Sequence, residues 1–362
     1  MNRVIKVLHT EWSDGWGGQE IRIIDEMLAV RDQGVEVFLA CREHASIRQK
    51  AEEQKIPVFV LPFRGNLDFK TLFALKKLIS QHQIDIVNTH SGKDTWVGGL
   101  AAKLAGAKFI RTRHLSNRIS SNPTNFINEL ADYIFTTGES VRSDMIKLNR
   151  IRPNRIESVP TGIDTRIYDP SLYSRIECRK KFNIQKDEIA IGIIAVLRQF
   201  KRHDLFIKMS RRIVELYPTK KFVFFIAGDG PQKGKLISLT KKLGMFSKIK
   251  FLDYISEVPE LLTAIDIFVL SSDSKEGVPQ SVIQALMMNK AVVATNSGST
   301  IDLLKDNNFK LVDPNSLSSL VDGVVEYIKF PQNINTRKYI VDNFSQEKMS
   351  KKILNIYKEL VV

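Results

Sequence analysis

The feature that most limits the fold of this chain is a repeated alternation of short apolar runs with stretches of helical periodicity. Apolar runs occur at Val4–Leu8 and Val35–Cys41, and the segment between them places Ile21, Ile24 and Leu28 on one helical face. Successive strands that are separated by helices run parallel, because the chain crosses back over the sheet between them. The alternation therefore predicts an α/β protein with doubly wound parallel sheets.

The alternation is interrupted once and then restarts. Pro160, Gly162 and Pro170 precede a segment with little apolar periodicity, and a second series of buried runs begins at Ile189–Leu197. We therefore expect two Rossmann-like parallel-sheet domains facing a cleft, with six or seven strands in the first. The predicted parts are a first domain at 1–168, a linker at 169–186, a second domain at 187–340 and a C-terminal helix at 341–362 that packs back on the first domain.

Composition narrows the classes of function. The net charge of +14 fits nucleic acid, an anionic membrane surface, an anionic substrate or a merely solvated basic surface. No nucleic-acid-binding motif accompanies the charge, so that class rests on charge alone. No apolar run approaches the ~18 residues of a membrane helix, and Cys41 and Cys178 form neither a disulfide framework nor a metal-ligand pattern. These features predict a cytoplasmic protein, with peripheral contact at the inner face of the cytoplasmic membrane. The expected contacts are the segment 111–128, with Arg113 and Arg118, and the helix that carries Lys76 and Lys77.

One stretch, Ser271–Ser299, has the parts of a βαβ unit. The apolar run Asp266–Leu270 leads into a loop with Glu276, Pro279 stands where a helix would begin, and Ala291–Thr295 is the next expected strand. Ligands of such sheets bind beyond the carboxyl ends of the strands, and the start of a helix favours an anion. The loop predicts a site for a ligand with hydroxyls and phosphate, such as a nucleotide sugar. The alternative is that Glu276 is a solvated loop acid.

Other polar residues follow strands at the same predicted edge. Gly17 and Gly18 lie between the first strand and the first helix, where glycine lets backbone approach a phosphate or a sugar. Their spacing is not that of a dinucleotide-binding loop, so they do not indicate a nicotinamide cofactor. His90 and His114 end the fourth and fifth strands, where imidazoles can bind hydroxyls or share a proton. The alternatives are that Gly17 and Gly18 form a plain turn, and that His90 and His114 are structural residues whose hydrogen bonds are made within the protein.

Two cations follow the first strand of the second half. Arg198 and Lys201 suit a diphosphate, because arginine can chelate oxygens and lysine adds a point charge. A solvated basic turn is the alternative. Asp229 lies in the glycine-containing loop that follows the next strand. The histidines show no pair at zinc spacing, so neither a metal nor another cofactor is expected.

The chain resembles the retaining glycosyltransferases of family GT4, the group 1 type with the GT-B fold, over nearly its whole length. The resemblance comes from seven segments that occur in the family's order. They are GWGGQE at Gly15–Glu20, NTHS at Asn88–Ser91, RTRHLS at Arg111–Ser116, VPTGID at Val159–Asp164, LRQFKRH at Leu197–His203, AGDGP at Ala227–Pro231 and SSDSKEGVPQS at Ser271–Ser281. None of these segments is decisive alone, but the ordered set is specific.

The resemblance implies roles for individual residues. His114 matches a histidine near the sugar and acceptor, Arg198 and Lys201 match the pair that neutralises the diphosphate, and Glu276 matches an acid that holds donor hydroxyls. Gln284 stands where the family has a second acid. The substrate-binding positions implied are Gly17, Gly18, His90, Gly228, Asp229, Ile255, Gly277, Val278, Pro279 and Gln284.

The function implied is that of a metal-independent, retaining glycosyltransferase. It would move a sugar from a nucleotide diphosphate-sugar to a hydroxyl of a glycolipid or saccharide acceptor, in the biosynthesis of lipopolysaccharide, glycolipid or surface polysaccharide. Glutamine offers one acceptor oxygen where glutamate offers two, so Gln284 weakens the expected hold on the nucleotide ribose. The alternatives are a nucleotide-sugar epimerase or hydrolase of the same fold, and a basic nucleic-acid-binding protein.

Overall fold

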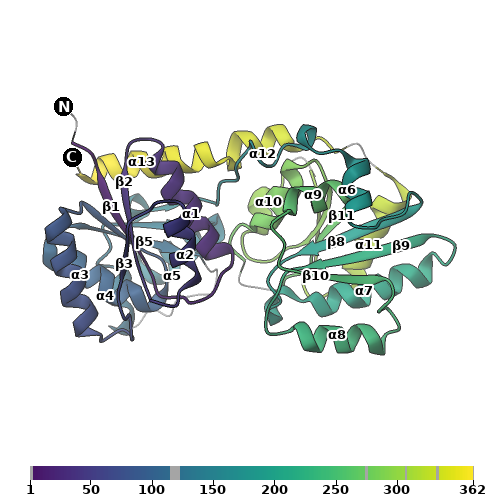
Figure 1. Cartoon of the computed structure of the whole chain (residues 1–362), viewed down its shortest axis with the longest axis horizontal. Coiled ribbons are helices and arrows are strands. Elements are labelled where there is room, and N and C mark those ends of the chain that lie inside the picture. Colours follow the sequence, from purple (N-terminus) through teal and green to yellow (C-terminus); the bar gives the residue numbers. More distant parts are fainter. Residues whose placement is uncertain (1–2, 115–122, 274–275, 306–307, 332–333, 362) are drawn as a thin grey trace. The chain divides into compact units, whose positions relative to one another are not determined.

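The computed structural model describes residues 3–114, 123–273, 276–305, 308–331 and 334–361. These residues form two compact units. The first comprises Met1–Gly162 and Gln346–Val362, and the second comprises Ile163–Ser345. Each unit contains a parallel sheet with helices on both faces (Figure 1). The two parallel-sheet, Rossmann-like domains predicted from the sequence are therefore confirmed.

The first unit is built on a sheet of seven strands in the order β3-β2-β1-β4-β5-β6-β7, in which every neighbouring pair is parallel. The strands are β1 (Lys6–Glu11), β2 (Glu36–Cys41), β3 (Val58–Val60), β4 (Ile86–Thr89), β5 (Lys108–Arg113), β6 (Tyr133–Thr136) and β7 (Ile156–Ser158). The α-helices are α1 (Gly18–Arg31), α2 (Ser46–Glu53), α3 (Phe69–His82), α4 (Gly92–Ala105), α5 (Glu139–Asn149) and α13 (Gln346–Val361). Short 3₁₀ turns lie at Pro123–Asn128 (η1) and Pro153–Arg155 (η2).

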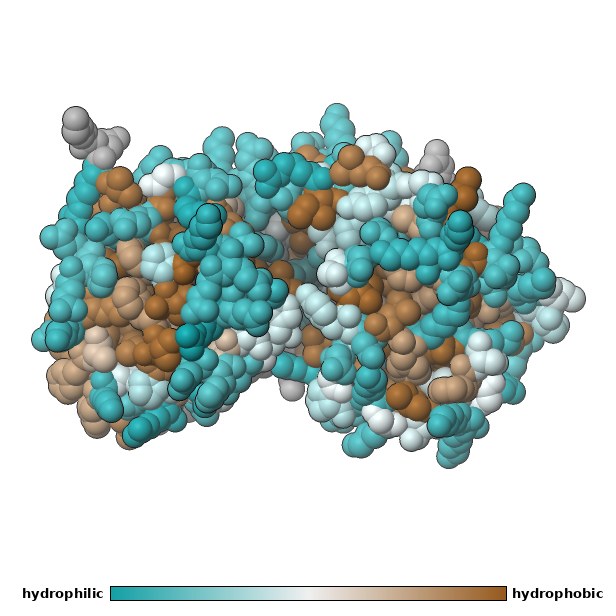
Figure 2. All heavy atoms as spheres, in the orientation of Figure 1, coloured by the Kyte–Doolittle hydropathy of each residue, from teal (hydrophilic) through white to brown (hydrophobic). Residues whose placement is uncertain are grey.

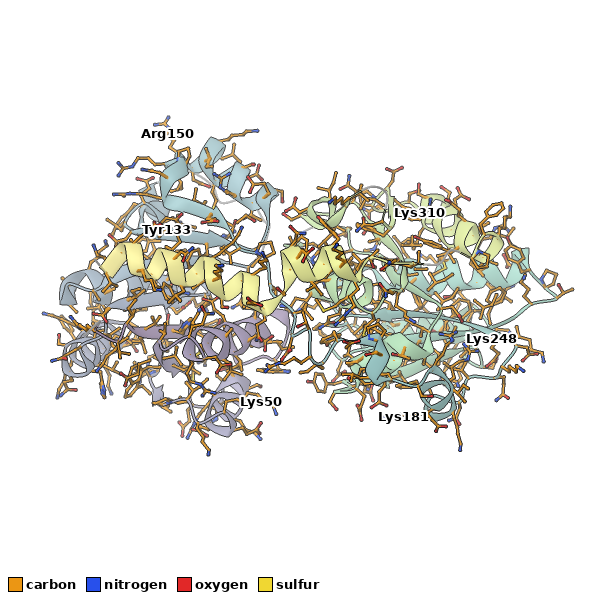
Figure 3. The ribbon with its side chains drawn as sticks, turned by 90° about the horizontal axis from the view of Figure 1, so that it is seen from above. Lys50, Tyr133, Arg150, Lys181, Lys248 and Lys310 are labelled. Atoms are coloured by element: carbon orange, nitrogen blue, oxygen red, sulfur yellow. The ribbon has the colours of Figure 1, made fainter. Side chains whose placement is uncertain are left out.

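Alternation along the strands builds two cores in this unit. Successive side chains of a strand point to opposite faces, so Leu8 packs with α3 and α4 whereas Val7 packs with α1 and α13. Figure 3 shows α13 lying across the second of these faces, beside Tyr133 of β6. The last helix of the chain thus belongs to the first unit, where Tyr357 and Ile353 are fully buried.

The second unit contains a parallel sheet of six strands in the order β10-β9-β8-β11-β12-β13. The strands are β8 (Glu188–Ile194), β9 (Lys221–Ala227), β10 (Ile249–Asp253), β11 (Ile267–Leu270), β12 (Ala291–Thr295) and β13 (Lys310–Val312). The α-helices are α6 (Arg175–Lys181), α7 (His203–Leu216), α8 (Lys233–Lys242), α9 (Val258–Ala264), α10 (Gln280–Met287), α11 (Leu317–Lys329) and α12 (Arg337–Phe344). The 3₁₀ turns are η3 (Pro170–Leu172), η4 (Gln199–Lys201) and η5 (Thr300–Leu303).

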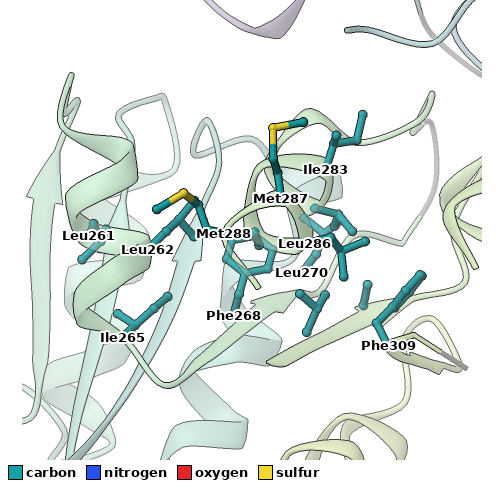
Figure 4. Close-up of a cluster of buried hydrophobic side chains, with 14 of the residues drawn as sticks. Leu261, Leu262, Ile265, Phe268, Leu270, Ile283, Leu286, Met287, Met288 and Phe309 are labelled. Atoms are coloured by element: carbon teal, nitrogen blue, oxygen red, sulfur yellow. The ribbon is translucent and has the colours of Figure 1, made fainter. Parts of the chain in front are cut away.

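The core of the second unit supports the helix that follows Glu276. Figure 4 shows Ile283 and Leu286 of α10 near Leu270 of β11 and Phe309, and all four belong to one buried cluster. This packing anchors α10 to the sheet, so the loop before it is held at the carboxyl end of β11. The opposite face of the same sheet is covered by α7, α8 and α11.

The structure corrects the predicted linker. Residues 169–186 contain η3 and α6, and Cys178 of α6 is buried in the core of the second unit. Arg179 also donates hydrogen bonds to the carbonyl oxygens of Gln185 and Glu188. The boundary between the units falls between Gly162 and Ile163, before the position predicted. The low apolar periodicity that suggested a linker reflects a short helix with a single fully buried side chain.

Candidate functional site

The centre of the candidate site in the second unit is an ion pair between two loops at the carboxyl edge of the sheet. Lys201 follows β8, Glu276 follows β11, and these strands are neighbours. Lys201 Nζ lies 2.6 Å from Glu276 Oε1, and the side chains are only 16% and 7% exposed. The fold therefore brings together two of the residues predicted to be catalytic.

Several neighbours hold Glu276 in place. Ser272 Oγ donates to the same Oε1 atom at 2.5 Å, and the Ser299 N–H donates to the Glu276 carbonyl oxygen at 3.2 Å. Gly298 has a φ of +56°, and a Cβ there would lie 1.9 Å from that carbonyl oxygen, so only glycine fits. Among the described residues, no hydrogen bond reaches Glu276 Oε2. That oxygen is therefore available to accept hydrogen bonds from a ligand's hydroxyls.

Arg198 lies apart from this ion pair. Its side chain is exposed and lines a cavity of about 410 Å³ in the second unit, together with Arg202, Lys235 and Asp273. The cavity wall carries both signs of charge with an excess of cations, which suits an anion. The structure thus puts Lys201 in a buried pair and leaves Arg198 facing solvent, so the two predicted diphosphate ligands are in different surroundings.

Gly228 and Asp229 lie in the loop after β9, at the same edge. Gly228 has a φ of +135°, and a Cβ there would lie 2.1 Å from the carbonyl oxygen of Ala195. The loops after β8 and β9 can therefore approach each other only with glycine at this position. Asp229 is exposed, and its Oδ1 accepts from the Gly230 N–H at 2.8 Å. Ile255 is half-buried and packs on the hydrophobic core.

The segment before α10 differs from expectation at one residue. Pro279 is the N-cap residue with an extended backbone, and the helix begins at Gln280. Val278 is 4% exposed and its side chain packs in the core, so its role in substrate binding stays a prediction. Gly277 and Gln284 are half-buried. Gln284, one turn into α10, makes no side-chain hydrogen bond within the described part of the chain.

In the first unit, the predicted glycines lie at the start of α1. Gly17 is its N-cap residue and Gly18 its first residue. The first N–H groups of a helix have no partner within the helix and favour an anion. The backbone of Gly17 is extended, with a φ of −166°, so conformational strain does not require glycine there. The lack of a side chain leaves the start of α1 open to close approach.

His90 and His114 are brought together, and a third histidine joins them. His90 Nδ1 lies 3.0 Å from His114 Nε2, and His90 Nε2 lies 2.9 Å from His9 Nδ1. His90 is 2% exposed, so it offers little surface to a ligand and its role in substrate binding stays a prediction, whereas His114 is half-buried. The sequence analysis missed His9, although its place near the end of the first strand, beside the fourth, was a usable signal.

Two buried carboxylates near these histidines were also missed. Asp94 Oδ2 accepts from the His90 N–H at 3.0 Å and from Thr10 Oγ1 at 2.6 Å. Glu11 accepts from the Ser13 N–H at 2.7 Å and from Gln19 Nε2 at 2.6 Å. Burial, with a further contribution from the charge of Asp94, raises the pKa of Glu11 to about 8. Asp94 thus fixes the turn between β4 and α4, and Glu11 carries a proton that a carboxyl usually loses.

The described residues were also searched for a metal-binding site and for a membrane-spanning helix. They contain no group of three or more histidine, cysteine or acidic side chains arranged to hold a metal ion. Within the same described ranges, no helix has both the length and the apolar composition needed to cross a membrane.

Comparison with known proteins identifies the family. Residues 174–358, more than half of the chain, match the family model described as glycosyl transferases group 1. The chain belongs to the group 1 glycosyl transferases. Residues 16–167 of this glycosyl transferase match a second family model, glycosyltransferase family 4. The resemblance inferred from the seven segments is therefore confirmed, and a transferase is supported over the alternative functions.

Named relatives and solved structures cover between three quarters and nearly all of this group 1 glycosyl transferase. A UDP-Gal:alpha-D-GlcNAc-diphosphoundecaprenol alpha-1,3-galactosyltransferase of Escherichia coli is 23% identical, over 99% of this chain and 98% of its own. The putative glycosyltransferase EpsD of Bacillus subtilis is 24% identical, over 76% of this chain and 75% of its own. A glycosyltransferase structure from Rickettsia africae superposes with a TM-score of 0.88 at 19% identity, covering 99% of both chains. The HepE structure from Anabaena with UDP and glucose has a TM-score of 0.83 at 18% identity, covering 98% of this chain and all of that one.

Proposed function

We propose that the protein is a cytoplasmic, retaining and metal-independent glycosyltransferase. It takes a sugar from a nucleotide diphosphate-sugar and transfers it to a hydroxyl of a glycolipid or saccharide acceptor, in the biosynthesis of lipopolysaccharide or a surface polysaccharide. The observation that carries the proposal is the Lys201–Glu276 pair at the carboxyl edge of the second sheet, in a member of this family. Names of relatives agree with it: one uses a UDP-sugar and a diphosphoundecaprenol-linked acceptor, and another acts in O-antigen biosynthesis.

The proposed chemistry assigns one role to each side chain at that edge. Glu276 Oε2 accepts hydrogen bonds from hydroxyls of the donor sugar, while Oε1 stays bound to Lys201 and Ser272. Lys201 and Arg198 supply positive charge as the bond between the sugar and the diphosphate breaks. Electrostatic stabilisation of a leaving group in a partly dehydrated site is among the largest contributions to catalysis. In this proposal the side-chain cations, rather than a metal ion, neutralise the diphosphate.

Gln284 is proposed to face the ribose of the donor nucleotide. It has one acceptor oxygen and no competing hydrogen bond among the described residues. Hydrogen bonds to a charged acceptor contribute ~1.5–3 kcal/mol and those to a neutral one ~0.5–1.5 kcal/mol. The glutamine therefore weakens donor binding by about 1 kcal/mol relative to a glutamate, which is several-fold in affinity and compatible with turnover.

We also propose peripheral contact with an anionic membrane, through the second of the two expected surfaces, the helix that carries Lys76 and Lys77 (α3), rather than through 111–128. In the segment 111–128, Arg111 is buried and Arg113 is half-buried, and burial lowers the pKa of Arg113 to about 9; Arg118 lies outside the described residues. The outer face of α3 instead carries Phe69 and Phe73, which are 63% and 60% exposed. Lys70 and Lys77 lie on the same helical face, and Lys76 is half-buried. Figure 2 shows apolar side chains gathered over α3 and α4.

A two-stage experiment tests the transferase. UDP-, GDP- and ADP-sugars are first screened by thermal shift, because a ligand that binds only the folded state raises its apparent stability. The donor that shifts the transition is then incubated with a polyprenyl-diphosphate-linked sugar, with and without EDTA, and the product linkage is determined by NMR. We expect acceptor-dependent product with the anomeric configuration of the donor, and no loss of rate with EDTA.

Three results would contradict parts of this proposal. Sugar release without acceptor would indicate a hydrolase. A product with inverted anomeric configuration would contradict the proposed retaining mechanism. If EDTA abolishes activity and a divalent cation restores it, the proposed metal independence is contradicted. Glu276→Gln tests the role of the carboxylate, because it keeps the size of the side chain but removes its charge.

A further inference from the structure

The three-histidine chain, His9–His90–His114, forces its rings to share one tautomer. Each of its two hydrogen bonds joins an Nδ1 atom to an Nε2 atom, and one atom of each pair must carry the proton. A neutral imidazole has one N–H. A proton on Nδ1 of His90 therefore makes its Nε2 an acceptor from His9 Nδ1, and it makes His114 Nε2 an acceptor in turn. All three rings are therefore Nδ1–H in this case. If His90 carries its proton on Nε2 instead, all three rings are Nε2–H.

The surroundings keep the rings neutral, so this rule applies. Burial lowers the pKa of His9 to about 3. Burial, followed by the charges of Arg22, Arg111 and Arg113, lowers the pKa of His114 well below its usual value. Burial, followed by the charges of His9, His114, Arg111 and Arg22, lowers the pKa of His90 well below its usual value. No ring therefore gains a second proton near neutral pH.

The inner end of the chain decides between the two tautomers. His9 Nε2 is buried and has no hydrogen-bond partner in the described structure. In the Nε2–H arrangement this atom would be a buried N–H without an acceptor, whereas in the Nδ1–H arrangement it is an unprotonated nitrogen. Buried N–H groups without partners are rarer in proteins than acceptors with unused lone pairs. The Nδ1–H arrangement is therefore favoured.

We infer that His9 and His90 are positioning residues that hold His114 as its Nδ1–H tautomer. His114 then offers a hydrogen-bond donor to a substrate oxygen and does not act as a base. The neighbouring structure supports the alignment: Asp94 accepts from the His90 N–H, and the rings of His9 and His90 are within 8° of parallel. The inference rests on the proposed function for the identity of the substrate, but the tautomer itself does not depend on it.

The tautomer can be read directly by NMR. Two-bond ¹H–¹⁵N correlations of protein labelled with ¹⁵N-histidine distinguish Nδ1–H from Nε2–H rings. The signals of the six histidines are assigned from single histidine-to-glutamine variants. His82, which is not part of the three-histidine chain, is the internal comparison. We expect the Nδ1–H pattern for His9, His90 and His114. An Nε2–H pattern, or averaging between tautomers, at any of the three would overturn the inference.

Kinetics then separate positioning from a purely structural role. His9→Leu and His90→Leu should each lower kcat by about 10- to 100-fold, the range typical when a group that orients a functional histidine is removed. KM for the donor should change little, because the residues proposed to hold the donor are in the second unit. His90→Gln keeps a donor and an acceptor, so it should retain more activity than His90→Leu. His82→Gln, at the other end of the sheet, is the matched control.

The two readouts keep the outcomes distinct. Unchanged kcat in folded His9→Leu and His90→Leu would overturn the positioning role. If the wild-type protein transfers no sugar, the proposed function fails, while the NMR spectrum still decides the tautomer. Should His90→Leu not fold, His9→Leu and the wild-type spectrum remain decisive.

Discussion

At the scale of single residues, the buried Lys201–Glu276 pair and the exposed Arg198 make different predictions. Lys201→Ala and Arg198→Ala should each lower kcat by ~10²-fold or more, as expected when one electrostatic stabiliser is lost. Lys201→Ala should also reduce stability, because it leaves the Glu276 carboxylate buried without its partner. Steady-state kinetics and thermal unfolding measure the two effects. Lys208→Ala, an exposed lysine of α7, is the control, and near-normal turnover in both variants would contradict the assignment.

Glu11 makes a prediction about pH. Its pKa is raised from 4.5 to about 8 in the folded protein, so the folded state binds the proton more tightly than the unfolded state does. The stability that this contributes is present below pH 4.5 and is lost as pH rises towards 8. Glu11→Gln mimics the protonated acid and should remove this part of the pH dependence.

Urea unfolding of both proteins at pH 6 and pH 9 checks the prediction for Glu11. The advantage of Glu11→Gln over the wild type should be larger at pH 9 than at pH 6. Titrating groups that do not interact with Glu11 cancel in the comparison, whereas Asp94, whose charge helps raise the pKa of Glu11, is part of the effect measured. Equal differences at the two pH values would show that Glu11 is ionised in the folded protein.

At the scale of elements, a buried ion pair joins α1 to the sheet and to α13. Arg22 and Glu26 are fully buried, with Arg22 Nη2 3.3 Å from Glu26 Oε2. Arg22 Nη1 donates to the Val159 carbonyl oxygen at 2.7 Å, and Glu26 Oε1 accepts from Asn88 Nδ2 at 3.1 Å and from Tyr357 Oη at 3.5 Å. The pair thus lies where β4, β7 and two helices meet.

Removing one partner of this pair should be costly. Glu26→Leu leaves the Arg22 guanidinium buried without compensation, which costs about 3–5 kcal/mol of unfolding free energy. The double variant Arg22→Met/Glu26→Leu should recover part of this loss, because no charge is then left buried without its partner, although the Val159 carbonyl, Asn88 and Tyr357 lose hydrogen bonds. Urea unfolding measures both. Glu52→Ala, which breaks the exposed Arg48–Glu52 pair at the same helical spacing, should change stability little, and a double variant no more stable than Glu26→Leu would contradict the account.

At the scale of the whole molecule, the net charge of +14 and the outer face of α3 predict reversible binding to anionic vesicles. Each basic residue near such a surface contributes ~1 kcal/mol. Co-sedimentation at low salt should bring the protein down with anionic vesicles, and ~0.5 M salt should release it, because the Debye length is then below ~8 Å.

Two double variants of α3, compared with one double variant in the second unit, locate the membrane contact. Lys70→Glu/Lys77→Glu and Phe69→Ser/Phe73→Ser should both weaken sedimentation. Lys241→Glu/Lys242→Glu changes the net charge as much as the lysine pair does, but on exposed residues of α8 in the second unit. Equal loss in both lysine variants would attribute binding to net charge rather than to α3. Equal recovery with neutral and anionic vesicles would remove the membrane proposal altogether.

The amino-acid pattern alone was enough to predict the two doubly wound sheets and the loops that carry the candidate site. Hydrophobic periodicity and helix signals are local, so the strands of the second sheet could be predicted to within a few residues. The parallel arrangement then placed Lys201, Asp229 and Glu276 at one edge, since the carboxyl ends of parallel strands share an edge.

Which side chains are in contact could not be predicted from the sequence and is known from the folded structure. Lys201 and Glu276 are 75 residues apart in the chain and meet because β8 and β11 are neighbours, which depends on strand order. His9 joins His90 for the same reason, because β1 lies beside β4. The burial of Arg111 and the packing of α6 in the core of the second unit likewise depend on which faces the surrounding elements cover. Such contacts depend on the packing of distant segments, and a local pattern in the sequence does not record them.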